Sequence, residues 1–412
     1  MQDKLAINGG KPIRKDFLPY AHHWIDEKDI KEVVKTLKSD WITQGPKIEE
    51  FEKLVSNYCD AKYAVALSSG TAALHAAAYA SGIGRNDELI TTPITFAASG
   101  NCAVYLGGNV KFADIKKDTY NINQKEIKKA ITKKTKAIVP VDYTGQPCDI
   151  DEINEIASEK DIVVIEDGSH GIGSIYKNKK IGGLTDMTVL SFHPAKHITT
   201  GEGGMVLTNN EEFYDKLNMF RTHGITKDRK KLLKNEGNWY YEMQLLGYNY
   251  RITDFQCALG ISQMKKIDKF IKRRREIVKE YNKEFSKIDE IITPFEKKDV
   301  KTAYHLYMIQ LNLDKLKTGR KEIFDALRAE NIGVHVHYIP LHLQPYYQEV
   351  FGYKKGDFPI AEKYYNQALT LPLFPKMSEK EVNDVINAVK KVINYFRKWG
   401  GKTVEHCCNS SS

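Results

Sequence analysis

The chain has 412 residues, of which 42% are hydrophobic and 28% are charged, and its formal net charge is +9 at pH 7. These proportions are ordinary for a soluble globular protein. No run approaches the ~20 apolar residues of a membrane span, and the first residues, Met1–Ile7, lack the apolar core of a signal peptide. We therefore expect a cytoplasmic protein without a membrane partner, and the length predicts about two domains.

Much of the positive charge lies in two helix-like stretches, Lys227–Lys234 and Lys265–Arg275. Such stretches indicate either a solvated basic face or attraction to a polyanionic small substrate. No nucleic-acid-binding module is recognisable in the chain, so we do not expect a nucleic-acid partner.

The first 60 residues predict an N-terminal arm and two amphipathic helices. Apolar residues recur at helical spacing in Ile25–Leu37 and again in Ile48–Tyr58. Between them, Trp41–Pro46 is a turn signal, and Pro46 is expected to end any extended segment.

The segment Tyr63–Tyr79 predicts a short apolar strand, a small polar turn and an alanine-rich helix. The start of such a helix offers unpaired amide N–H groups and the positive end of the helix dipole. Gly70, Thr71 and Ala72 are small enough for an anion to rest on these amides. The pattern indicates either a phosphate site or an ordinary Ser/Thr helix cap.

Four further strands are predicted in the first half of the chain, one of them at the end of a helix, turn and strand over Ala103–Asp114. Leu89–Asn101 contains a strand followed by a helix start, with Phe96 either in the core or free to stack on a planar cofactor. Ala137–Tyr143 and Asp161–Asp167 are continuous apolar runs on either side of a helical pattern at Ile150–Lys160. Continuous apolar strands separated by helices predict an α/β fold with a mostly parallel sheet covered on both faces.

A lysine follows the next strand and enters a glycine-rich segment. Met187–Ser191 is strand-like, Lys196 comes five residues later, and a second strand-like run, Met205–Thr208, leads away. Burial between two strands would lower the pKa of the lysine and make a neutral, nucleophilic amine available. That amine suits the chemistry of an aldehyde cofactor. The alternative is a surface lysine in a glycine-rich turn.

Four of these positions fall at predicted strand ends: Gly70, Asp167, Ser191 and Lys196. In open parallel sheets, ligands bind in the crevice at the carboxyl ends of the strands. We therefore expect the topology to bring these residues together, although they are far apart in the sequence.

The sheet pattern fades after Thr208. A helix (Glu211–Arg221), a charged loop (Gly224–Asn238) and a small structured turn (Leu246–Asp254) are predicted next. Phe255–Tyr281 reads as a single long amphipathic helix that leads to the second domain.

The second domain is predicted to hold two strands and three helices. The strands are expected near Tyr304–Leu311 and Val334–Tyr338, and the helices near Lys321–Glu330, Pro359–Gln367 and Glu379–Lys398. The predicted organisation is an arm and large domain over 1–260, a connecting helix and small domain over 261–400, and a flexible tail over 401–412.

The six cysteines have no zinc spacing, so no metal site is predicted and reduced thiols are expected. Cys407 and Cys408 lie in the polar end of the chain, where metal binding or a disordered end are the two interpretations.

Taken together, four motifs in this order resemble the DegT family of pyridoxal-phosphate (PLP) sugar aminotransferases, and the resemblance runs from Thr43 to about residue 395. The motifs are Gly-Thr-Ala-Ala from Gly70, Glu-Asp-Gly-Ser-His ending at His170, Ser-Phe-His-Pro-Ala-Lys ending at Lys196, and Gly-Tyr-Asn-Tyr-Arg ending at Arg251. The resemblance implies the aspartate-aminotransferase fold (PLP fold type I). That fold has a large domain with a mixed, mostly parallel sheet and a smaller C-terminal α+β domain.

The resemblance also implies roles for the cofactor residues. Lys196 would be the Schiff-base lysine and proton shuttle, and Asp167 would pair with the pyridine nitrogen of PLP, which makes the ring an electron sink. Phe96 would stack on the ring, since offset aromatic stacking fixes a ring plane. His170 stands where many relatives have Gln, near the ring hydroxyl, and His193 lies near the lysine with either a site or a structural role.

The remaining implied residues hold the phosphate or border the substrate. Gly70, Thr71, Ala72 and Ser191 resemble the phosphate cradle. Asn249 matches an asparagine that reaches the phosphate from a partner subunit, so a homodimer with a shared active site is implied. The residues implied for the sugar-nucleotide pocket are Thr43, Gln44, Arg251, His337 and Tyr338. Arg251 could meet a nucleotide phosphate or form an ordinary salt bridge, and Glu202 would hold the loop or the neighbouring subunit.

Within the family, the chain looks most like the pseudaminic-acid branch. This implies transfer of an amino group from an amino acid, expected to be L-glutamate, to the C-4 keto group of a UDP-linked 4-keto-6-deoxy-N-acetylhexosamine, with pyridoxamine phosphate as the intermediate cofactor form. The alternatives are an aminotransferase for another keto sugar nucleotide (C-3 or dTDP-linked) and a non-catalytic PLP-binding regulatory protein. Sugar dehydration is disfavoured because dehydratase relatives replace the lysine with histidine.

Overall fold

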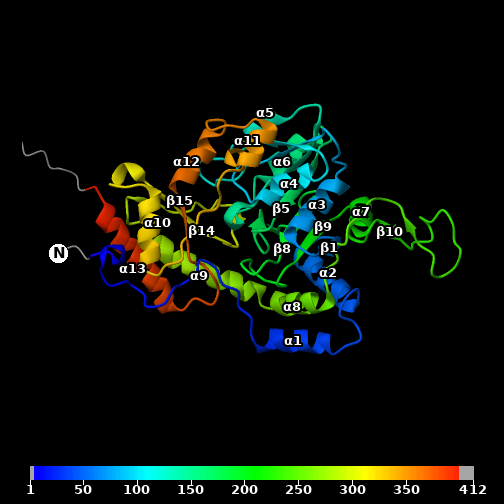
Figure 1. The fold of residues 1–412 in the computed structure, drawn as a ribbon, viewed down its shortest axis with the longest axis horizontal. Coiled ribbons are helices and arrows are strands. Elements are labelled where there is room, and N and C mark those ends of the chain that lie inside the picture. The colour runs from blue at the N-terminus through cyan, green and yellow to red at the C-terminus, as the bar shows by residue number, and fades with distance from the viewer. Residues whose placement is uncertain (1–3, 399–412) are drawn as a thin grey trace, which may run out of the picture.

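A computed structural model describes residues 4–398 of the chain. The large sheet and the helices around it form one side of the molecule, and a smaller unit with α10 (Arg320–Ala329) and α13 (Glu379–Phe396) forms the other (Figure 1). The predicted tail over 401–412, with Cys407 and Cys408, lies outside the described residues. Within residues 4–398 there is no helix both long and apolar enough to cross a membrane.

A seven-stranded sheet forms the centre of the large unit, in the order β1-β9-β8-β5-β4-β2-β3. Its strands are β1 (Tyr63–Leu67), β2 (Glu88–Thr91), β3 (Asn109–Phe112), β4 (Thr135–Val139), β5 (Val163–Asp167), β8 (Met187–Ser191) and β9 (Gly204–Thr208). All neighbours pair in parallel except β9, which is antiparallel to both β1 and β8. The predicted α/β fold with a mainly parallel sheet is confirmed.

Helices follow the strands in the predicted order, except that α5 was not predicted from the sequence. They are α2 (Pro46–Tyr58), α3 (Gly70–Ala80), α4 (Ala97–Val104), α5 (Gln124–Ala130), α6 (Ile150–Ser158) and α7 (Glu211–Arg221). Pro46 begins α2, where its fixed φ suits the first helical position and no amide is lost. The alanines of α3 are buried, so this helix packs closely on the sheet and holds its first turn at the strand ends.

The predicted single helix over Phe255–Tyr281 is wrong. The chain instead forms α8 (Asp254–Met264) and α9 (Ile267–Phe285), with a break at Lys265–Lys266. Lys266 donates through Nζ to Asp29 Oδ2 at 2.5 Å and lies 3.0 Å from Asp26. This anchor to the start of α1 (Glu27–Leu37) fixes the break, a tertiary contact that helical periodicity does not encode.

Helix α1 packs along α8 with an unusual distribution of side chains. Its buried residues are polar, Asp29 and Thr36, whereas Ile30, Val34 and Leu37 are 47%, 40% and 53% exposed. Apolar residues at this spacing form one stripe along a helix. The stripe therefore points away from the rest of the chain, and we call it the α1 stripe.

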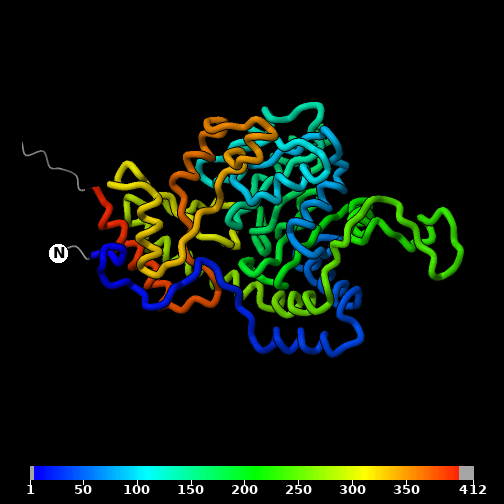
Figure 2. Tube along the Cα trace, in the orientation of Figure 1, coloured from blue at the N-terminus to red at the C-terminus, as the bar shows by residue number. Residues whose placement is uncertain are grey.

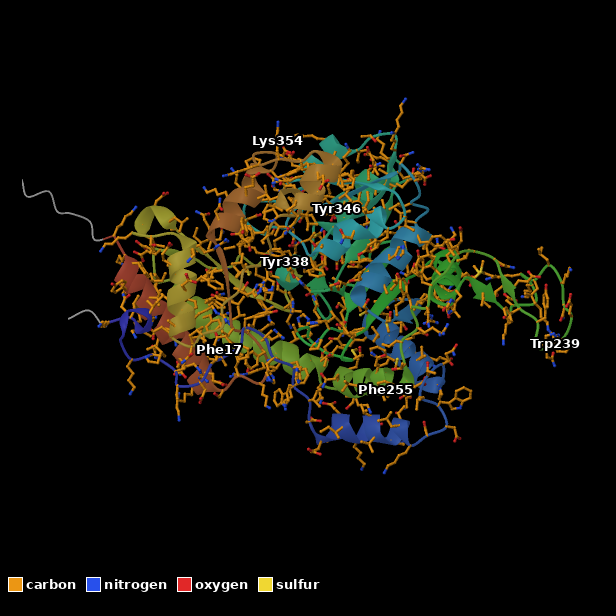
Figure 3. All side chains as sticks on the ribbon, viewed as in Figure 1. Phe17, Trp239, Phe255, Tyr338, Tyr346 and Lys354 are labelled. Atoms are coloured by element: carbon orange, nitrogen blue, oxygen red, sulfur yellow. The ribbon has the colours of Figure 1, made fainter. Side chains whose placement is uncertain are left out.

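The predicted charged loop Gly224–Asn238 is part of a protruding arm (Figure 2). Two short strands, β10 (Ile225–Thr226) and β11 (Glu242–Met243), pair antiparallel at its base. Apolar side chains stay exposed on the arm, with Leu233 at 92% and Trp239 at 73%. Trp239 lies far from the main body (Figure 3).

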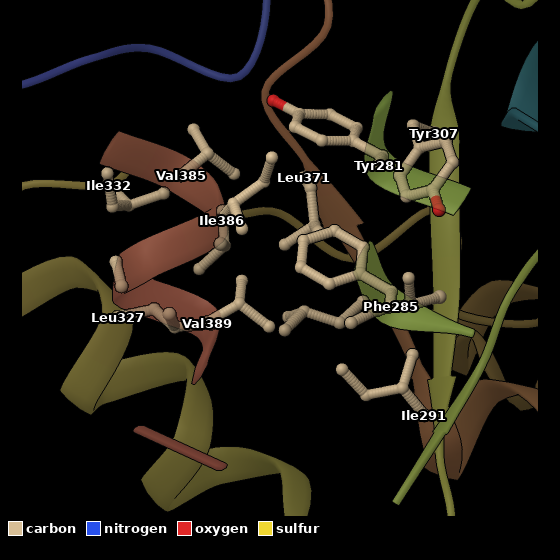
Figure 4. Packing of buried hydrophobic residues seen from close by; sticks show 14 of the residues in the cluster. Tyr281, Phe285, Ile291, Tyr307, Leu327, Ile332, Leu371, Val385, Ile386 and Val389 are labelled. Atoms are coloured by element: carbon tan, nitrogen blue, oxygen red, sulfur yellow. The ribbon is translucent and has the colours of Figure 1, made fainter. Parts of the chain in front are cut away.

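The smaller unit has its own apolar core (Figure 4), in which Tyr281, Phe285 and Tyr307 pack against Val385 and Val389. Its sheet has the order β12-β14-β15. The elements are β12 (Ile291–Ile292), β14 (Tyr307–Leu311), α10 (Arg320–Ala329), α12 (Pro359–Gln367), β15 (Ala368–Leu371) and α13 (Glu379–Phe396). Helix α11 (Pro345–Phe351) lies against the large unit, where Tyr347 packs in the core. A third small sheet joins β13 (Val300–Lys301), β6 (Ile175–Tyr176) and β7 (Lys179–Lys180).

The strand predicted at Val334–Tyr338 does not form. His335 makes only an isolated bridge with Thr370. The hydroxyl of Tyr143 donates to the carbonyl oxygen of His337, so this stretch bonds to the large unit instead of extending a sheet. Leu5 also packs in the core of the smaller unit, so the N-terminal segment begins there and not on the large unit. The predicted domain boundary at 260/261 stays a prediction.

Candidate active site

A cavity of about 640 Å³ lies at the carboxyl ends of β5 and β8, next to the first turns of α3 and α4. This volume is in the range of small-molecule sites. The predicted site residues that line it are Gly70, Thr71, Phe96, Asp167, His170, Ser191, His193, Lys196, Glu202, His337 and Tyr338. The expected convergence of distant strand ends is therefore present.

Lys196 lies between the end of β8 and the start of β9. A turn holds it there, in which the Lys196 amide donates to His193 O at 2.9 Å. Burial among protein atoms lowers the pKa of the Lys196 amine to about 8, and the negative charge of Asp167 opposes part of this shift. A substantial fraction of the amine is therefore neutral and nucleophilic near pH 8.

Asp167 is held by two donors at the end of β5. The hydroxyl of Ser99 donates to Asp167 Oδ2 at 2.6 Å, and the amide of Ser169 donates to Oδ1 at 3.1 Å. Ser99 is fully buried in α4 and also bonds to Thr95 at 2.7 Å. The two bonds fix the direction of the carboxylate toward the cavity.

The preceding residue, Glu166, points to the other face of the sheet because side chains alternate along a strand. It accepts from the Thr188 hydroxyl at 2.7 Å. Burial raises its pKa to about 7, and burial beside Glu166 raises the pKa of Asp142 well above its usual value. Two buried carboxyls this close favour sharing a proton, which limits the negative charge behind Asp167.

The first turn of α3 meets the end of β8 very closely. A Cβ on Gly70 would lie 3.0 Å from Ser191 Cβ, so no larger residue fits without a shift. Ser69 caps the helix and accepts from the Ala72 amide at 3.1 Å. Ala72 itself does not line the cavity, so Gly70, Thr71 and Ser191 form the part of the predicted cradle that does.

An aromatic wall closes the side of the cavity toward the smaller unit. The Phe96 ring is 60% exposed and its centroid lies 6.2 Å from that of Tyr338. The Tyr338 hydroxyl lies 3.2 Å from His170 Nε2. Burial, followed by the charge of Lys196, lowers the pKa of His170 well below its usual value, so this imidazole is neutral. Tyr338 reaches the site from the middle of the molecule (Figure 3).

Besides Ala72, four predicted site residues do not line this cavity: Thr43, Gln44, Asn249 and Arg251. They lie near one another, because Thr43 bridges to Thr253 and Asn249 bridges to Thr222 at the base of the arm. Thr43, Gln44 and Asn249 are exposed.

Sequence reasoning missed several residues of the cavity: Tyr20, Ser69, Thr95, Ser99, Ser169, His305 and His335. Ser69 and Ser169 adjoin motif residues, and Ser99 lies three residues after Phe96 at a helix start, so their positions gave a usable signal. Tyr20, His305 and His335 come from segments with no motif of their own. Among residues 4–398, no group of three or more His, Cys, Asp or Glu side chains could hold a metal ion.

The donor set fits a phosphorylated aromatic aldehyde. A carboxylate, an exposed aromatic face and an amine of lowered pKa surround the cavity, and a tight helix N-terminus offers amides to a phosphate. Each of these groups matches one chemical feature of PLP.

A family model described as the DegT/DnrJ/EryC1/StrS aminotransferase family matches residues 23–390. The spore coat polysaccharide biosynthesis protein SpsC of Bacillus subtilis is 44% identical over 92% of this chain and 98% of its own length. The UDP-4-amino-4,6-dideoxy-N-acetyl-beta-L-altrosamine transaminase of Campylobacter jejuni is 38% identical over 92% and 99%. These matches agree with the resemblance found in the sequence.

Among solved structures, Helicobacter pylori PseC, an aminotransferase involved in the biosynthesis of pseudoaminic acid, superposes with a TM-score of 0.85. It is 32% identical, and the match covers 93% of this chain and 100% of that chain. The match confirms the predicted aminotransferase fold.

Proposed function

The chain belongs to the DegT/DnrJ/EryC1/StrS family and is a PLP-dependent sugar aminotransferase, and from this premise we propose its specific reaction. The amino group moves from L-glutamate to the C-4 keto group of a UDP-linked 4-keto-6-deoxy-N-acetylhexosamine. The similarity to the altrosamine transaminase over nearly the full length of both chains supports this substrate class. The observation that carries the proposal is Lys196, whose amine has a lowered pKa, in one cavity with Asp167 and the α3 N-terminus.

When bound, PLP supplies an aldehyde that takes up the amino group and a ring that withdraws electrons from the reacting carbon. We assign Asp167 to the ring nitrogen, because a carboxylate there favours the protonated ring. We assign Phe96 to the ring face, and Thr71 and Ser191 to the phosphate. His170, held beside the Tyr338 hydroxyl, is assigned to the ring oxygen.

Lys196 moves the proton in this proposal. Its neutral amine would accept a proton from the α-carbon of the amino donor and pass it to the cofactor carbon that receives the amino group. With the keto sugar bound, Lys196 would carry a proton from that cofactor carbon to the sugar carbon. A pKa of about 8 suits both steps, since a general acid–base group is most efficient when its pKa lies near the working pH.

A second candidate is amination of another keto sugar nucleotide, C-3 or dTDP-linked. The 44% identity to SpsC, a protein of spore coat polysaccharide biosynthesis, supports only the general point that the sugar differs from that of the altrosamine transaminase.

The proposal includes a homodimer with a shared active site. Thr43, Gln44, Asn249 and Arg251 lie together but outside the cavity of their own chain. The α1 stripe and the arm expose apolar side chains, and exposed apolar surface of this kind marks interaction sites. A second copy would cover these surfaces and bring Asn249 and Arg251 to the cavity of its partner.

A transamination assay with L-glutamate and a panel of UDP- and dTDP-linked keto sugars tests the proposed reaction. The UDP-linked 4-keto sugar should be aminated fastest. Lys196→Ala should lose the activity and the borohydride-fixed cofactor label on its peptide, and Lys179→Ala, which changes an exposed lysine outside the cavity, should keep both. Preference for a 3-keto or dTDP-linked sugar would support the second candidate, and amination of no sugar in the panel would exclude both.

A further inference from the structure

A second large cavity, which we call the basic groove, runs along α9 on the side that faces the small sheet β13-β6-β7. Its volume is about 720 Å³, again in the range of small-molecule sites. Residues of α9 at spacings of three or four line it, and such residues share one face of a helix. They include Asp268, Lys272, Arg275, Lys279 and Asn282.

Four lysines border the groove from both walls. Lys272 and Lys279 come from α9, and Lys180 and Lys301 come from the small sheet. None of the four makes an ion pair with a carboxylate in the part of the chain that the structure describes. The Lys180 ammonium instead lies 3.3 Å from the centroid of the Tyr58 ring, which holds it at the groove.

The carboxylates of the groove are already engaged by other groups. Asp268 accepts from the Tyr58 hydroxyl at 2.7 Å, and Glu296 accepts from both terminal nitrogens of Arg275 at 2.6 and 3.2 Å. The third, Glu276, lies 3.6 Å from Arg273 outside the groove. The Tyr58 hydroxyl is neutral and leaves the charge of Asp268 in place, but five basic side chains line the groove against three acidic ones, a net charge of +2. A cleft concentrates the resulting positive potential.

The groove is separate from the active-site cavity and shares no lining residue with it. One layer of chain divides the two. Tyr304 lines the groove and the next residue, His305, lines the active site; Gly173 lines the groove three residues after His170. Arg274 holds this wall from inside by donating to Tyr304 O at 3.3 Å and His305 O at 3.1 Å.

We propose that the basic groove is a second ligand site that binds a diphosphate group. Four ammonium groups on facing walls match the charge of two linked phosphates, which lysines bind as point charges. The diphosphate can be free or can belong to a nucleoside diphosphate, the chemical class of the proposed substrate. The binding of a diphosphate depends only on the residues of the groove. This proposal therefore holds even if the enzyme aminates a different sugar from the one proposed above.

Isothermal titration of the PLP-loaded enzyme with inorganic pyrophosphate tests the proposal at low ionic strength, where screening is weak. The double variant Lys272→Ala/Lys279→Ala should weaken pyrophosphate binding about tenfold, since each lysine contributes one modest charge pair. Both residues are exposed helix positions, where alanine is well tolerated, and far-ultraviolet circular dichroism verifies folding.

The control is Lys125→Ala/Lys355→Ala, which removes the same charge from exposed positions outside the groove. It should bind pyrophosphate within about twofold of the wild type, since distant exposed charges are screened. Equal weakening in both double variants, or no pyrophosphate binding to the wild type, would overturn the proposal.

Titration with UDP distinguishes the two sources of the diphosphate. The part of the affinity that the Lys272/Lys279 variant loses belongs to the groove, whatever UDP does at the active site. If the groove binds UDP more tightly than pyrophosphate, its ligand is a nucleoside diphosphate. If the groove binds the two equally, its ligand is the free diphosphate. Failure of transamination with every keto sugar leaves this result unchanged, so the two proposals fail separately.

Discussion

The proposed chemistry depends on one side chain, the amine of Lys196. An ordinary lysine has a pKa near 10.5, whereas burial lowers the Lys196 pKa to about 8. The motif placed this lysine correctly, but only its surroundings in the fold set the protonation state.

The first prediction concerns pH. The rate at which PLP reacts with Lys196 in the cofactor-free protein should rise with pH and level off above about pH 8, since only the neutral amine attacks. The measurement is the initial rise of visible absorbance over a pH series. Because Asp167 raises the Lys196 pKa, Asp167→Asn should move the midpoint to lower pH. A midpoint near 10.5 would contradict the prediction.

The same shift affects stability. The folded protein releases the Lys196 proton at about pH 8 and the unfolded chain at about 10.5. Between these values the unfolded state binds more protons, so the Lys196 contribution to the free energy of unfolding should increase as pH rises through this window.

The second prediction concerns Ser99, which we infer to be a positioning residue for Asp167. Ser99→Ala removes the 2.6 Å bond to the Asp167 carboxylate; hydrogen bonds to charged groups contribute about 1.5–3 kcal/mol. We expect kcat to fall about tenfold and the Kd for PLP to rise, with little change in the KM for the sugar. Ser81→Ala, which removes a bond to Ala78 O in α3, is the matched control. An unchanged Kd for PLP would contradict the positioning role.

At the scale of elements, α1 shows how a correct helix prediction can still leave its environment unknown. The spacing of apolar residues in Ile25–Leu37 predicted the helix, but not that Asp29 and Thr36 would face α8 while the apolar stripe faces outward. Likewise, α8 and α9 share a helical pattern, and the contact of Lys266 with Asp29 decides where it breaks.

The third prediction concerns the α1 stripe. Val34→Glu places a charge on a surface that we propose is covered by the partner subunit, and an unpaired charge there is costly. Light scattering should show a shift from a dimer toward the monomer mass of 47.0 kDa. The control, Lys28→Glu, changes an exposed charge outside the stripe and should remain dimeric. A Val34→Glu protein with wild-type mass would show that α1 lies outside the interface.

At the scale of the whole molecule, the site is a meeting of two units and, in our proposal, two chains. Phe96, Asp167 and Lys196 come from the large unit. Tyr338 comes four residues after Val334, which packs in the core of the smaller unit. Thr43, Gln44, Asn249 and Arg251 lie elsewhere in the same chain.

The fourth prediction concerns mixed dimers. Lys196→Ala alone should be inactive, and Asn249→Ala/Arg251→Ala alone should be strongly impaired. Unfolding and refolding the two together produces hybrids with one intact site each, so about a quarter of the wild-type activity should return under random pairing. Activity no higher than that of the separate variants would place Asn249 and Arg251 in the site of their own chain.

The sequence by itself determined the order of strands and helices in the large unit, and the convergence of Gly70, Asp167, Ser191 and Lys196. The order of the elements follows from local periodicity, and the convergence of the four residues follows from the rule that parallel strands end at one edge of a sheet. Residues close together in the sequence are enough to reveal both. It also determined the family, through motifs that adjoin those strand ends.

Only the tertiary structure decided the break before α9, the contact of Tyr338 with His170, the outward face of α1 and the unpaired lysines of the basic groove. Each depends on pairs such as Asp29 with Lys266 or His170 with Tyr338, which are more than 150 residues apart. Local spacing cannot encode such pairs, because the partner of each side chain is chosen by how the whole chain packs.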